Sequence, residues 1–345
     1  MTVTQGHAPG PRDVLGQRDV LDVVRDLGQS SSVFLALNEG NRYFTVPERR
    51  GLITYRPAGR RYWVQFTGAC AAEADRAALD HAFAAAAGDA GKRVIAVQLG
   101  RGDAERAVAD HWVVNQFGCS YSIDLTVFGL RGQKFVKTRN MITRSRREGV
   151  TVSEAASGRL ADPDFAAQLD GIDAAWLRNK GRHVKELRLM IGERGGAVQG
   201  QRRLFVAEAG GRVVAYISYS PVFGDRAGWL YDLTRRAPDA PPGVIEHVFA
   251  EAAQTFKDEG AGWLHLGLTP FVGLEPSYDL PGASRLLARA LALIGERGAA
   301  LYPAKTQLAF KLKWRPQLVT PEYIAFPGRI RLRDIWCLAR ATNSL

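Results

Sequence analysis

Short apolar runs bounded by turn residues dominate the first third of the chain. They are rich in Val, Ile, Phe, Tyr and Trp, and Gly, Asn and Pro separate them, a pattern typical of strands and hairpins. These runs lie at 33–46, 51–68 and 93–100. Residues 69–92 instead place Leu79 and Phe83 among alanines, which predicts an amphipathic helix ending near Gly88.

A second set of elements follows residue 150. A helix is predicted with Asp162 as its N-cap and with one apolar face. That face consists of Phe165, Leu169, Ile172 and Trp176. Two strands around Gly210 and Gly211 come next, then a strand at 228–233, a helix at 243–260 and a strand at 262–270. This order of elements is that of an N-acetyltransferase-like α/β domain, and the first region could be a degenerate copy of it.

The length and composition allow two hydrophobic cores. The chain has 345 residues, of which 46% are hydrophobic. We therefore expect an α/β (α+β) fold of two tandem N-acetyltransferase-like (GNAT-type) domains joined by a basic linker helix. The expected boundaries are a leader with a short helix at 1–30, a degenerate first domain at 31–131, the linker helix at 132–149 and a catalytic domain at 150–345.

Positive charge is in excess and is concentrated in the predicted linker. The chain holds 46 Lys and Arg against 35 acidic residues, a net charge of +11, which favours a polyanionic partner. Within 131–150 only Glu148 opposes a series of cations, while Phe135, Met141 and Ile142 can anchor one side of a helix. An RNA or phosphate contact is proposed for Lys137, Arg139, Arg144, Arg146 and Arg147. The alternative is a linker helix whose charges serve only its hydration.

Other classes of protein find little support. Cys70, Cys119 and Cys337 are far apart and form no Cys-x-x-Cys pair, so we expect buried thiols in a reducing cytosol. No stretch supplies 18 uncharged apolar residues, and the N-terminus lacks the apolar core of a secretory signal. We expect a cytoplasmic protein, either free or peripheral to a membrane, with no metal and no bound cofactor.

The segment between the strand at 228–233 and the next helix lacks the expected nucleotide cradle. Acetyltransferases of this fold hold the pyrophosphate of acetyl-CoA on backbone N–H groups at this helix N-terminus. Here Pro238, Pro241 and Pro242 have no N–H to donate, and only Gly243 permits close approach. A donor other than acetyl-CoA is indicated, with its phosphates held by side chains such as Arg235 and Arg236.

Six segments in one order resemble the cytosolic catalytic region of the phosphatidylglycerol lysyl- and alanyl-transferases, the multiple peptide resistance factor family. They are KFVKTRNMITRSRREGV, WLRNKG, GRVVAYISYSPV, YDLTRRAPDAPPG, WLHLGLTPFVGLE and FKLKWRPQLVTPEYIAFP. The resemblance implies two acetyltransferase-like domains, an aminoacyl-tRNA donor, and a passage between the domains that donor and acceptor enter from opposite sides.

The resemblance also implies catalytic residues. The family's catalytically sensitive turn maps onto Asp232, Leu233, Thr234 and Arg235. Asp232 could bind the α-ammonium of the aminoacyl group, or take a proton from the acceptor if burial raises its pKa from about 4. Arg235 would hold a terminal adenosine phosphate or an anionic acceptor. The alternative is a structural Asp–Arg pair that closes a turn.

A second basic segment lies near the C-terminus. Lys311 and Lys313 alternate with Phe310, Leu312 and Trp314, which predicts a strand with both lysines on one face. Lys311 could stabilise the tetrahedral oxyanion while Lys313 or Arg315 contacts phosphate. Solvent-exposed lysines on a strand are the alternative.

The acceptor is the least determined part. The chain begins almost at the catalytic region, without the multi-helix membrane portion of the family, which favours a small metabolite in secondary metabolism over phosphatidylglycerol or another anionic lipid. The transferred amino acid is left open among Ser, Ala, Gly and Lys, and a small neutral one is favoured. Two other classes stay open, an acyl-CoA N-acyltransferase and a noncatalytic tRNA- or lipid-binding protein.

Overall fold

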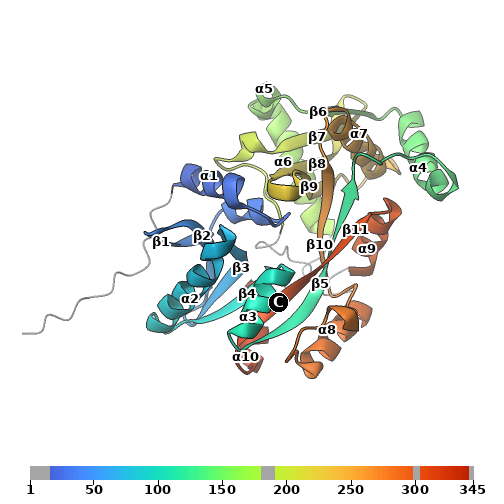
Figure 1. The fold of residues 1–345 in the computed structure, drawn as a ribbon. Coiled ribbons are helices and arrows are strands. Elements are labelled where there is room, and N and C mark those ends of the chain that lie inside the picture. Colours follow the sequence, from blue (N-terminus) through green and yellow to red (C-terminus); the bar gives the residue numbers. More distant parts are fainter. Residues whose placement is uncertain (1–15, 180–190, 298–303, 342–345) are drawn as a thin grey trace, which may run out of the picture.

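The computed structural model describes residues 16–179, 191–297 and 304–341, and it alternates strands and helices along the chain (Figure 1). The strands are β1 (Arg42–Val46), β2 (Arg49–Ala58), β3 (Tyr62–Ala71), β4 (Arg93–Leu99), β5 (Trp112–Asp124), β6 (Thr151–Glu154), β7 (Arg203–Ala209), β8 (Arg212–Val222), β9 (Gly228–Arg236), β10 (Trp263–Pro270) and β11 (Leu318–Pro327). The helices are α1 (Gln17–Leu27), α2 (Glu73–Asp89), α3 (Arg101–Ala109), α4 (Val136–Arg147), α5 (Ser157–Leu160), α6 (Pro163–Asn179), α7 (Val244–Asp258), α8 (Arg285–Arg297), α9 (Ala304–Lys313) and α10 (Leu332–Ala341).

All of these strands belong to one sheet, in the order β1-β2-β3-β4-β11-β5-β10-β9-β8-β7-β6. The last strand of the chain, β11, lies between β4 and β5 and is antiparallel to both. On its other side β5 pairs with β10. Strands from the first and second halves of the chain therefore interleave at the centre of the molecule.

Each half contains one parallel strand pair that separates partway along. The pairing of β3 with β4 ends at Phe66 and Val97, and the pairing of β9 with β10 ends at Leu230 and His265. In each half a helix connects the two parallel strands, α2 in the first and α7 in the second. This repeat confirms the predicted acetyltransferase-like class of fold.

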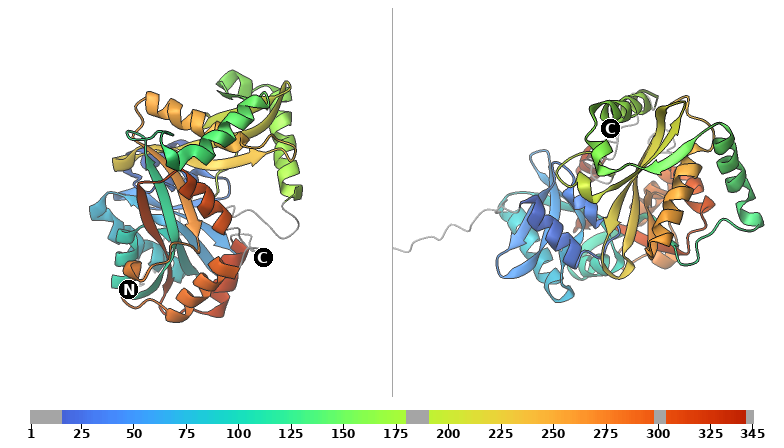
Figure 2. Two further views of the ribbon diagram at one scale, coloured as in Figure 1. Left: turned by 90° about the vertical axis from the view of Figure 1, so that its right-hand side faces the viewer. Right: turned by 90° about the horizontal axis from the view of Figure 1, so that it is seen from above.

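Helices α6 and α7 cover opposite faces of the second half (Figure 2). On β8, the Tyr216 hydroxyl donates to Asp173 of α6, whereas the Tyr219 ring packs against Phe256 of α7. Residues three apart on a strand point to opposite faces, so the two helices flank the sheet. The predicted linker helix is present as α4 and packs against α7.

Three local predictions are wrong. Residues 33–46 do not form one strand, because Val33–Leu37 is a buried 3-10 helix and β1 starts at Arg42. Asp232 and Arg235 lie within strand β9 rather than in a turn. Lys311 and Lys313 lie in helix α9 rather than in a strand.

The error at α9 has a clear physical origin. The five residues 310–314 alternate in polarity as in a strand, but Phe310 and Trp314 are also four apart and share one helix face. Both rings pack against Phe249 of α7, so tertiary packing selects the helix. Part of another predicted motif, Lys180 and Gly181 of WLRNKG, lies outside the described residues. Across the described ranges, no helix combines the length and apolarity needed to cross a bilayer.

Candidate active site at the separation of two parallel strands

Asp232 sits in an irregularity of β9, just beyond the point where β9 leaves β10. On β8, Ser218 pairs with Leu233 and Tyr219 pairs with Tyr231, so Asp232 is the extra residue of a β-bulge. The Ser220 hydroxyl donates a hydrogen bond to Oδ2 of Asp232. A Cβ on Gly192 would lie 2.0 Å from the Asp232 carboxyl carbon, so only glycine fits against this carboxylate.

Burial raises the pKa of Asp232 to about 6, against the opposing effects of the Ser220 hydrogen bond and the charge of Arg202. Its Oδ1 is buried and accepts no hydrogen bond of standard geometry from the described residues. Arg202 is itself buried and donates from Nη2 to Asn38 Oδ1 at 3.2 Å. The condition set for Asp232 as a proton acceptor, a pKa raised by burial, is therefore met.

A pocket of about 690 Å³, lined in part by Gly192 and Leu233 beside Asp232, is built from both halves of the chain. Its lining residues are Glu39, Gly40, Arg56, Asp173, Leu177, Ile191, Gly192, Glu193, Arg194, Leu233 and Arg235. Three arginines and three acids make its walls polar and close to neutral in sum. It has the size and position of a small-molecule site at an interface between two halves.

Arg235 lines this pocket but does not form the predicted turn with Asp232. Its guanidinium lies 3.8 Å from the centre of the Trp176 ring, and its Nε is 3.6 Å from Asp173 Oδ1. Arg235 is only 7% exposed. Its side chain is therefore positioned by contacts with α6, and little of it reaches solvent. Arg236, the last residue of β9, is exposed.

Lys311 lies on the other side of the same strand separation. It projects from α9, is 5% exposed, and donates from Nζ to the carbonyls of Gly267 and Leu268 at 2.7 and 2.9 Å. Gly267 marks a bulge of β10 with φ +69°, which frees carbonyls that would otherwise pair in the sheet. Lys311 therefore binds the free carbonyls of β10 at the point where β10 separates from β9.

The surroundings of Lys311 favour its uncharged form. Burial lowers the pKa of Lys311 to about 7, against the charge of Glu322 on β11. Burial likewise raises the pKa of Glu322 to about 7, although the Ser120 hydroxyl donates to its Oε1. This buried cluster contains residues from β5, α9 and β11, and so depends on the interleaved centre of the sheet.

The structure thus brings Asp232 and Lys311 to one strand separation, but from different sides. Asp232 lies with Gly192 and Arg202, and its neighbour Arg235 packs on α6. Lys311 comes from α9, which packs with α7. Since α6 and α7 flank opposite faces of the sheet, Arg235 and Lys311 approach it from opposite faces.

Other predicted site residues lie outside this centre. Lys313 forms an ion pair with Glu246 in the first turn of α7. Arg315, just after α9, is exposed and borders a separate pocket.

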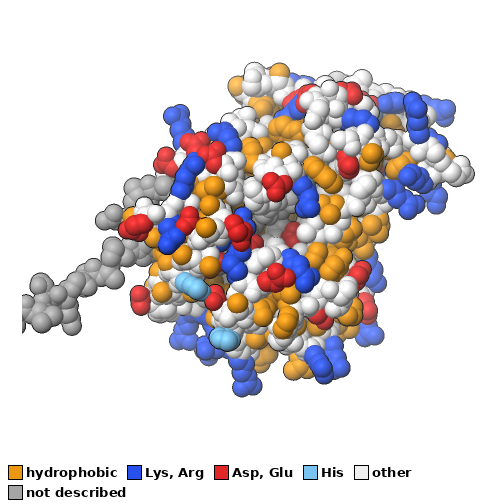
Figure 3. Space-filling model, in the orientation of Figure 1, with side chains coloured by type: hydrophobic (Ala, Val, Ile, Leu, Met, Phe, Trp, Pro, Cys, Tyr) orange, Lys and Arg blue, Asp and Glu red, His pale blue; other side chains and the backbone are white. Residues whose placement is uncertain are grey.

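The α4 cations divide into two groups (Figure 3). Arg139 donates to the carbonyls of Leu130 and Gly132, and Arg146 pairs with Glu251 of α7. Lys137, Arg144 and Arg147 are exposed and contact no acid within the described residues. Figure 3 shows Lys and Arg side chains gathered over α4.

Helix α4 also occupies the place of the missing nucleotide cradle. Gly243, the N-cap of α7, has φ +81°, and a Cβ there would lie 2.1 Å from the Met141 carbonyl oxygen of α4. The N-terminus of α7 is therefore in direct contact with another helix.

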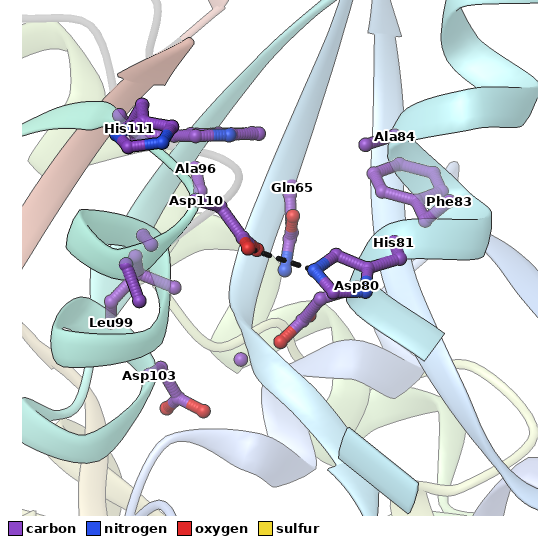
Figure 4. Close-up of a pocket in the computed structure, with 14 residues that line it drawn as sticks. Gln65, Asp80, His81, Phe83, Ala84, Ala96, Leu99, Asp103, Asp110 and His111 are labelled. Carbon is purple, nitrogen blue, oxygen red and sulfur yellow. Dashed lines mark hydrogen bonds and ion pairs between the residues drawn. The ribbon is translucent and has the colours of Figure 1, made fainter. Parts of the chain in front are cut away.

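A further pocket of about 450 Å³ lies in the first half, between α2 and α3 (Figure 4). His81 and Asp110 face each other across it at 2.8 Å, while Asp80 and Asp103 both contact Arg106. Burial raises the pKa of Asp80 to about 6. Its carboxylates disfavour phosphate, and Arg106 joins α2 to α3, which indicates a structural role.

These features define the class: an acyltransferase-like protein built from two GNAT-like halves with a polar site between them. The family model described as "Phosphatidylglycerol lysyltransferase, C-terminal" matches residues 23–326, and the chain belongs to this family. The resemblance predicted from the six segments is confirmed.

Sequence relatives carry related names. The chain is 30% identical over 144 residues to "Lysylphosphatidylglycerol biosynthesis bifunctional protein LysX" of Mycolicibacterium vanbaalenii, covering 42% of this chain and 13% of that protein. It is 25% identical over 196 residues to "Phosphatidylglycerol lysyltransferase" of Bacillus subtilis, covering 56% of this chain and 22% of that protein. The match thus spans less than a quarter of each of these relatives.

Solved structures agree in fold. "The structure of L-PGS from Bacillus licheniformis" superposes with a TM-score of 0.77 at 20% identity, covering 97% of this chain and 98% of that one. A C-terminal DUF2156 domain from Agrobacterium fabrum gives a TM-score of 0.75 at 23% identity, covering 95% of each chain.

The sequence analysis missed several residues of the site. Ser220, Arg202 and Gly192 surround Asp232, and Glu322 lies near Lys311. Gly192 and Arg202 are far from Asp232 in sequence, whereas Ser220 lies on the strand that pairs with β9, and Glu322 lies on β11, the element that follows α9. The alternation of side chains between the two faces of β8 could have indicated Ser220. No local pattern indicates Arg202, Gly192 or Glu322.

Proposed function

We propose that this protein transfers an aminoacyl group from tRNA to a hydroxyl of the phosphatidylglycerol headgroup. The observation that carries the proposal is the buried Asp232 carboxylate, whose pKa is raised to about 6, next to Gly192 and Leu233, which line a pocket between the two halves of the chain. A carboxylate with such a pKa is largely ionised at neutral pH and can accept a proton in the transition state. The names of the relatives favour a lipid acceptor over the small metabolite that the sequence analysis ranks first.

The proposed step is a transesterification. Asp232 takes the proton as the acceptor oxygen attacks the aminoacyl carbonyl carbon. The new C–O bond forms, the bond to the terminal ribose oxygen of tRNA breaks, and that oxygen receives the proton from Asp232. The donor ester is already activated, so holding donor and acceptor together is sufficient, and no covalent enzyme intermediate is required.

Lys311 and Arg235 receive supporting roles. Lys311 directs two of its donors to β10 carbonyls, so when it is protonated one N–H remains for the oxyanion of the tetrahedral intermediate. Arg235, fixed between Trp176 and Asp173, presents its guanidinium to the pocket, where it would hold a phosphate of the donor's terminal adenosine. Arg236 and Lys313 lie further from Asp232 and would contribute only to charge around the entrance.

An acyl-CoA donor fits less well. The position that a pyrophosphate occupies at a helix N-terminus would be at Gly243, where the Met141 carbonyl already lies. A carbonyl oxygen repels phosphate, so α4 both fills the space and opposes the charge. The position of the Met141 carbonyl alone therefore disfavours a pyrophosphate at this helix N-terminus.

Labelled aminoacyl transfer tests the proposal. The protein is incubated with tRNA charged separately with Lys, Ala, Ser or Gly and with phosphatidylglycerol vesicles, and label is counted in the chloroform phase. We expect one charged tRNA to label the lipid, with no transfer by Asp232→Asn. Label that enters water-soluble extract compounds instead would favour a metabolite acceptor, and tRNA hydrolysis no faster than in buffer would reject the donor.

Binding of tRNA depends, in this proposal, on the exposed cations of α4. Neutralising Lys137, Arg144 and Arg147 together should lower tRNA affinity and reduce the slope of log affinity against log salt by about 0.7 to 0.9 per lost phosphate contact. Filter binding at several salt concentrations measures this slope. Exchange of Arg285 and Arg289 on α8 to Gln is the control, and an equal change of slope there would contradict the role of α4.

A further inference from the structure

A third pocket, of about 560 Å³, lies beyond the C-terminal end of α9. It is bordered by the segment between β5 and α4, by the last turn of α7 and by the residues after α9. Its lining residues are Val127, Phe128, Gly129, Leu130, Arg131, Lys134, Phe135, Gln254, Lys257, Trp314, Arg315 and Gln317. We refer to this set as the α9-end pocket.

The charge of this pocket is of one sign. Arg131, Lys134, Lys257 and Arg315 contribute four cations, and the described lining contains no Asp or Glu. In the pocket beside Asp232, by contrast, Arg194 is paired with Asp170 and Asp173. Like charges held together without a counter-ion repel one another, so an arrangement of this kind favours an anionic ligand.

The pocket is also fixed in shape. Lys257 donates from Nζ to the Phe128 carbonyl at 2.6 Å, and Arg139 of α4 donates to the carbonyls of Leu130 and Gly132. These contacts hold the segment that carries Arg131. The side chains of Arg131 and Lys134 are exposed and form no ion pair within the described ranges, so they are available to a ligand.

One wall contains a buried hydrogen-bond donor with no acceptor. Trp314 is 1% exposed, and its indole N–H has no partner among the described residues. A buried donor left without an acceptor costs about 1 to 3 kcal/mol, so such groups commonly mark ligand positions.

Apolar side chains are exposed at the lining residue Val127 and on the adjoining helix α9. Val127 is 66% exposed, and Leu312, three residues before Arg315, is 46% exposed. Apolar side chains beside cations are the composition of surfaces that enter the interface of an anionic bilayer, where the apolar groups meet acyl chains and the cations meet phosphates. An RNA backbone would gain nothing from Val127.

We propose that the α9-end pocket binds the phosphate of an anionic phospholipid and docks the protein on the membrane surface. Arg131, Lys134 and Arg315 surround the phosphate, and Val127 and Leu312 insert beside it. Because α9 also carries Lys311, docking would place this side of the strand separation toward the bilayer. The proposal concerns binding alone and stands whether or not the transferase assignment does.

Vesicle flotation tests the docking site without any donor. The wild type, Arg131→Gln with Lys134→Gln, and Val127→Ser are compared on vesicles of phosphatidylglycerol in phosphatidylcholine and on pure phosphatidylcholine. The matched controls are Arg285→Gln with Arg289→Gln, and Leu286→Ser, which change an exposed arginine pair and an exposed leucine on α8. Thermal melting verifies that each variant is folded.

We expect the substitutions at the α9-end pocket, and not those on α8, to weaken binding to phosphatidylglycerol vesicles. Each cation near an anionic surface contributes about 1 kcal/mol, so the double variant should bind phosphatidylglycerol vesicles roughly 10-fold to 30-fold more weakly, with less than a twofold effect in the controls. Val127→Ser should weaken binding several-fold, and uncharged tRNA affinity should not change. Equal losses in the α8 controls, or a loss confined to tRNA with vesicle binding intact, would overturn the proposal.

Discussion

At the scale of single residues, the properties of Asp232 come from neighbours rather than from its own sequence position. The bulge in β9 directs the carboxylate toward Ser220, and Gly192 closes over it. Water is excluded from Oδ1, and the ionised form becomes more costly. The pKa of the Asp232 carboxyl group is thereby raised to about 6.

Asp232→Asn should remove both the activity and one pH effect. Transfer by the wild type should rise with pH through about 6, since Asp232 must be ionised, and the variant should be about 100-fold to 10,000-fold slower with that rise absent. Single-turnover transfer between pH 5 and 8 measures it. An unchanged pH profile in a folded variant would assign the proton to another group.

The raised pKa of Asp232 also makes the free energy of unfolding depend on pH in a defined direction. The folded pKa of Asp232 lies above its unfolded value, so the stability it contributes is complete below pH 4 and is lost as pH rises through about 6. Asp232→Asn should therefore lose less stability than the wild type between pH 4 and 7, by about 1 to 3 kcal/mol. Urea unfolding at the two pH values gives this difference.

Lys311 should matter for the fold as well as for the site. Lys311→Ala leaves the Gly267 and Leu268 carbonyls without this donor and Glu322 without a nearby cation, which should cost about 2 to 4 kcal/mol of unfolding free energy. Lys313→Ala removes a more exposed pair with Glu246 and should cost less than about 1 kcal/mol. Similar losses in both variants would show that Lys311 is not a structural anchor of β10.

At the scale of elements, the contact between α4 and α7 distinguishes this chain from an acetyl-CoA enzyme. Thr138, Ile142 and Ser145 form the buried face of α4, and Ser145 lies 3.2 Å from His247 of α7. The same packing leaves Lys137, Arg144 and Arg147 on the outer face. One helix therefore covers the N-terminus of α7 and presents a cationic surface.

Glycines at the two ends of α7 allow this contact to be measured. Gly243→Ala and Gly260→Ala both place a side chain at positive φ, +81° and +82°, but only at Gly243 does the new Cβ meet another helix. Gly260→Ala should cost about 1 kcal/mol, and Gly243→Ala about 3 kcal/mol or more, with faster amide exchange in α4. Equal losses of unfolding free energy in the two variants would mean that α4 moves away from the added methyl group at no cost.

At the scale of the whole molecule, interleaved strands join the two halves. Strand β11 supplies the second half's last strand to a position between β4 and β5, and β5 also pairs with β10. Neither half can complete its sheet without the other. The pocket beside Asp232 depends on this union, since Glu39, Gly40 and Arg56 come from the first half.

Unfolding should therefore be a single transition. Tryptophan fluorescence and far-ultraviolet circular dichroism should give coincident urea curves, although the chain is long enough for two domains. Removal of residues 317–345 should abolish the transition, because β4 and β5 would lose their shared partner. Two separated transitions of comparable size would show that the halves fold independently.

The sequence by itself determined the class of fold, the main helices and strands, and the family. Periodicity and turn residues act over a few positions, so patterns such as Phe165, Leu169 and Ile172 indicated α6 correctly. The same patterns indicated α4, and the family resemblance singled out Asp232 and Lys311. Where two periods fit, as at Lys311 and Lys313, local pattern gave a strand, and the packing of Phe310 and Trp314 on Phe249 decided for a helix.

Only the tertiary structure decided which residues surround each charge. Arg202 and Gly192, which are far from Asp232 in the chain, lie against it, and Glu322 of β11 comes near Lys311 of the preceding helix. Burial and electrostatic environment depend on every element packed around a group, so no short segment encodes them. The raised pKa of Asp232, the occupied N-terminus of α7 and the cationic pocket beyond α9 are for that reason properties of the folded chain.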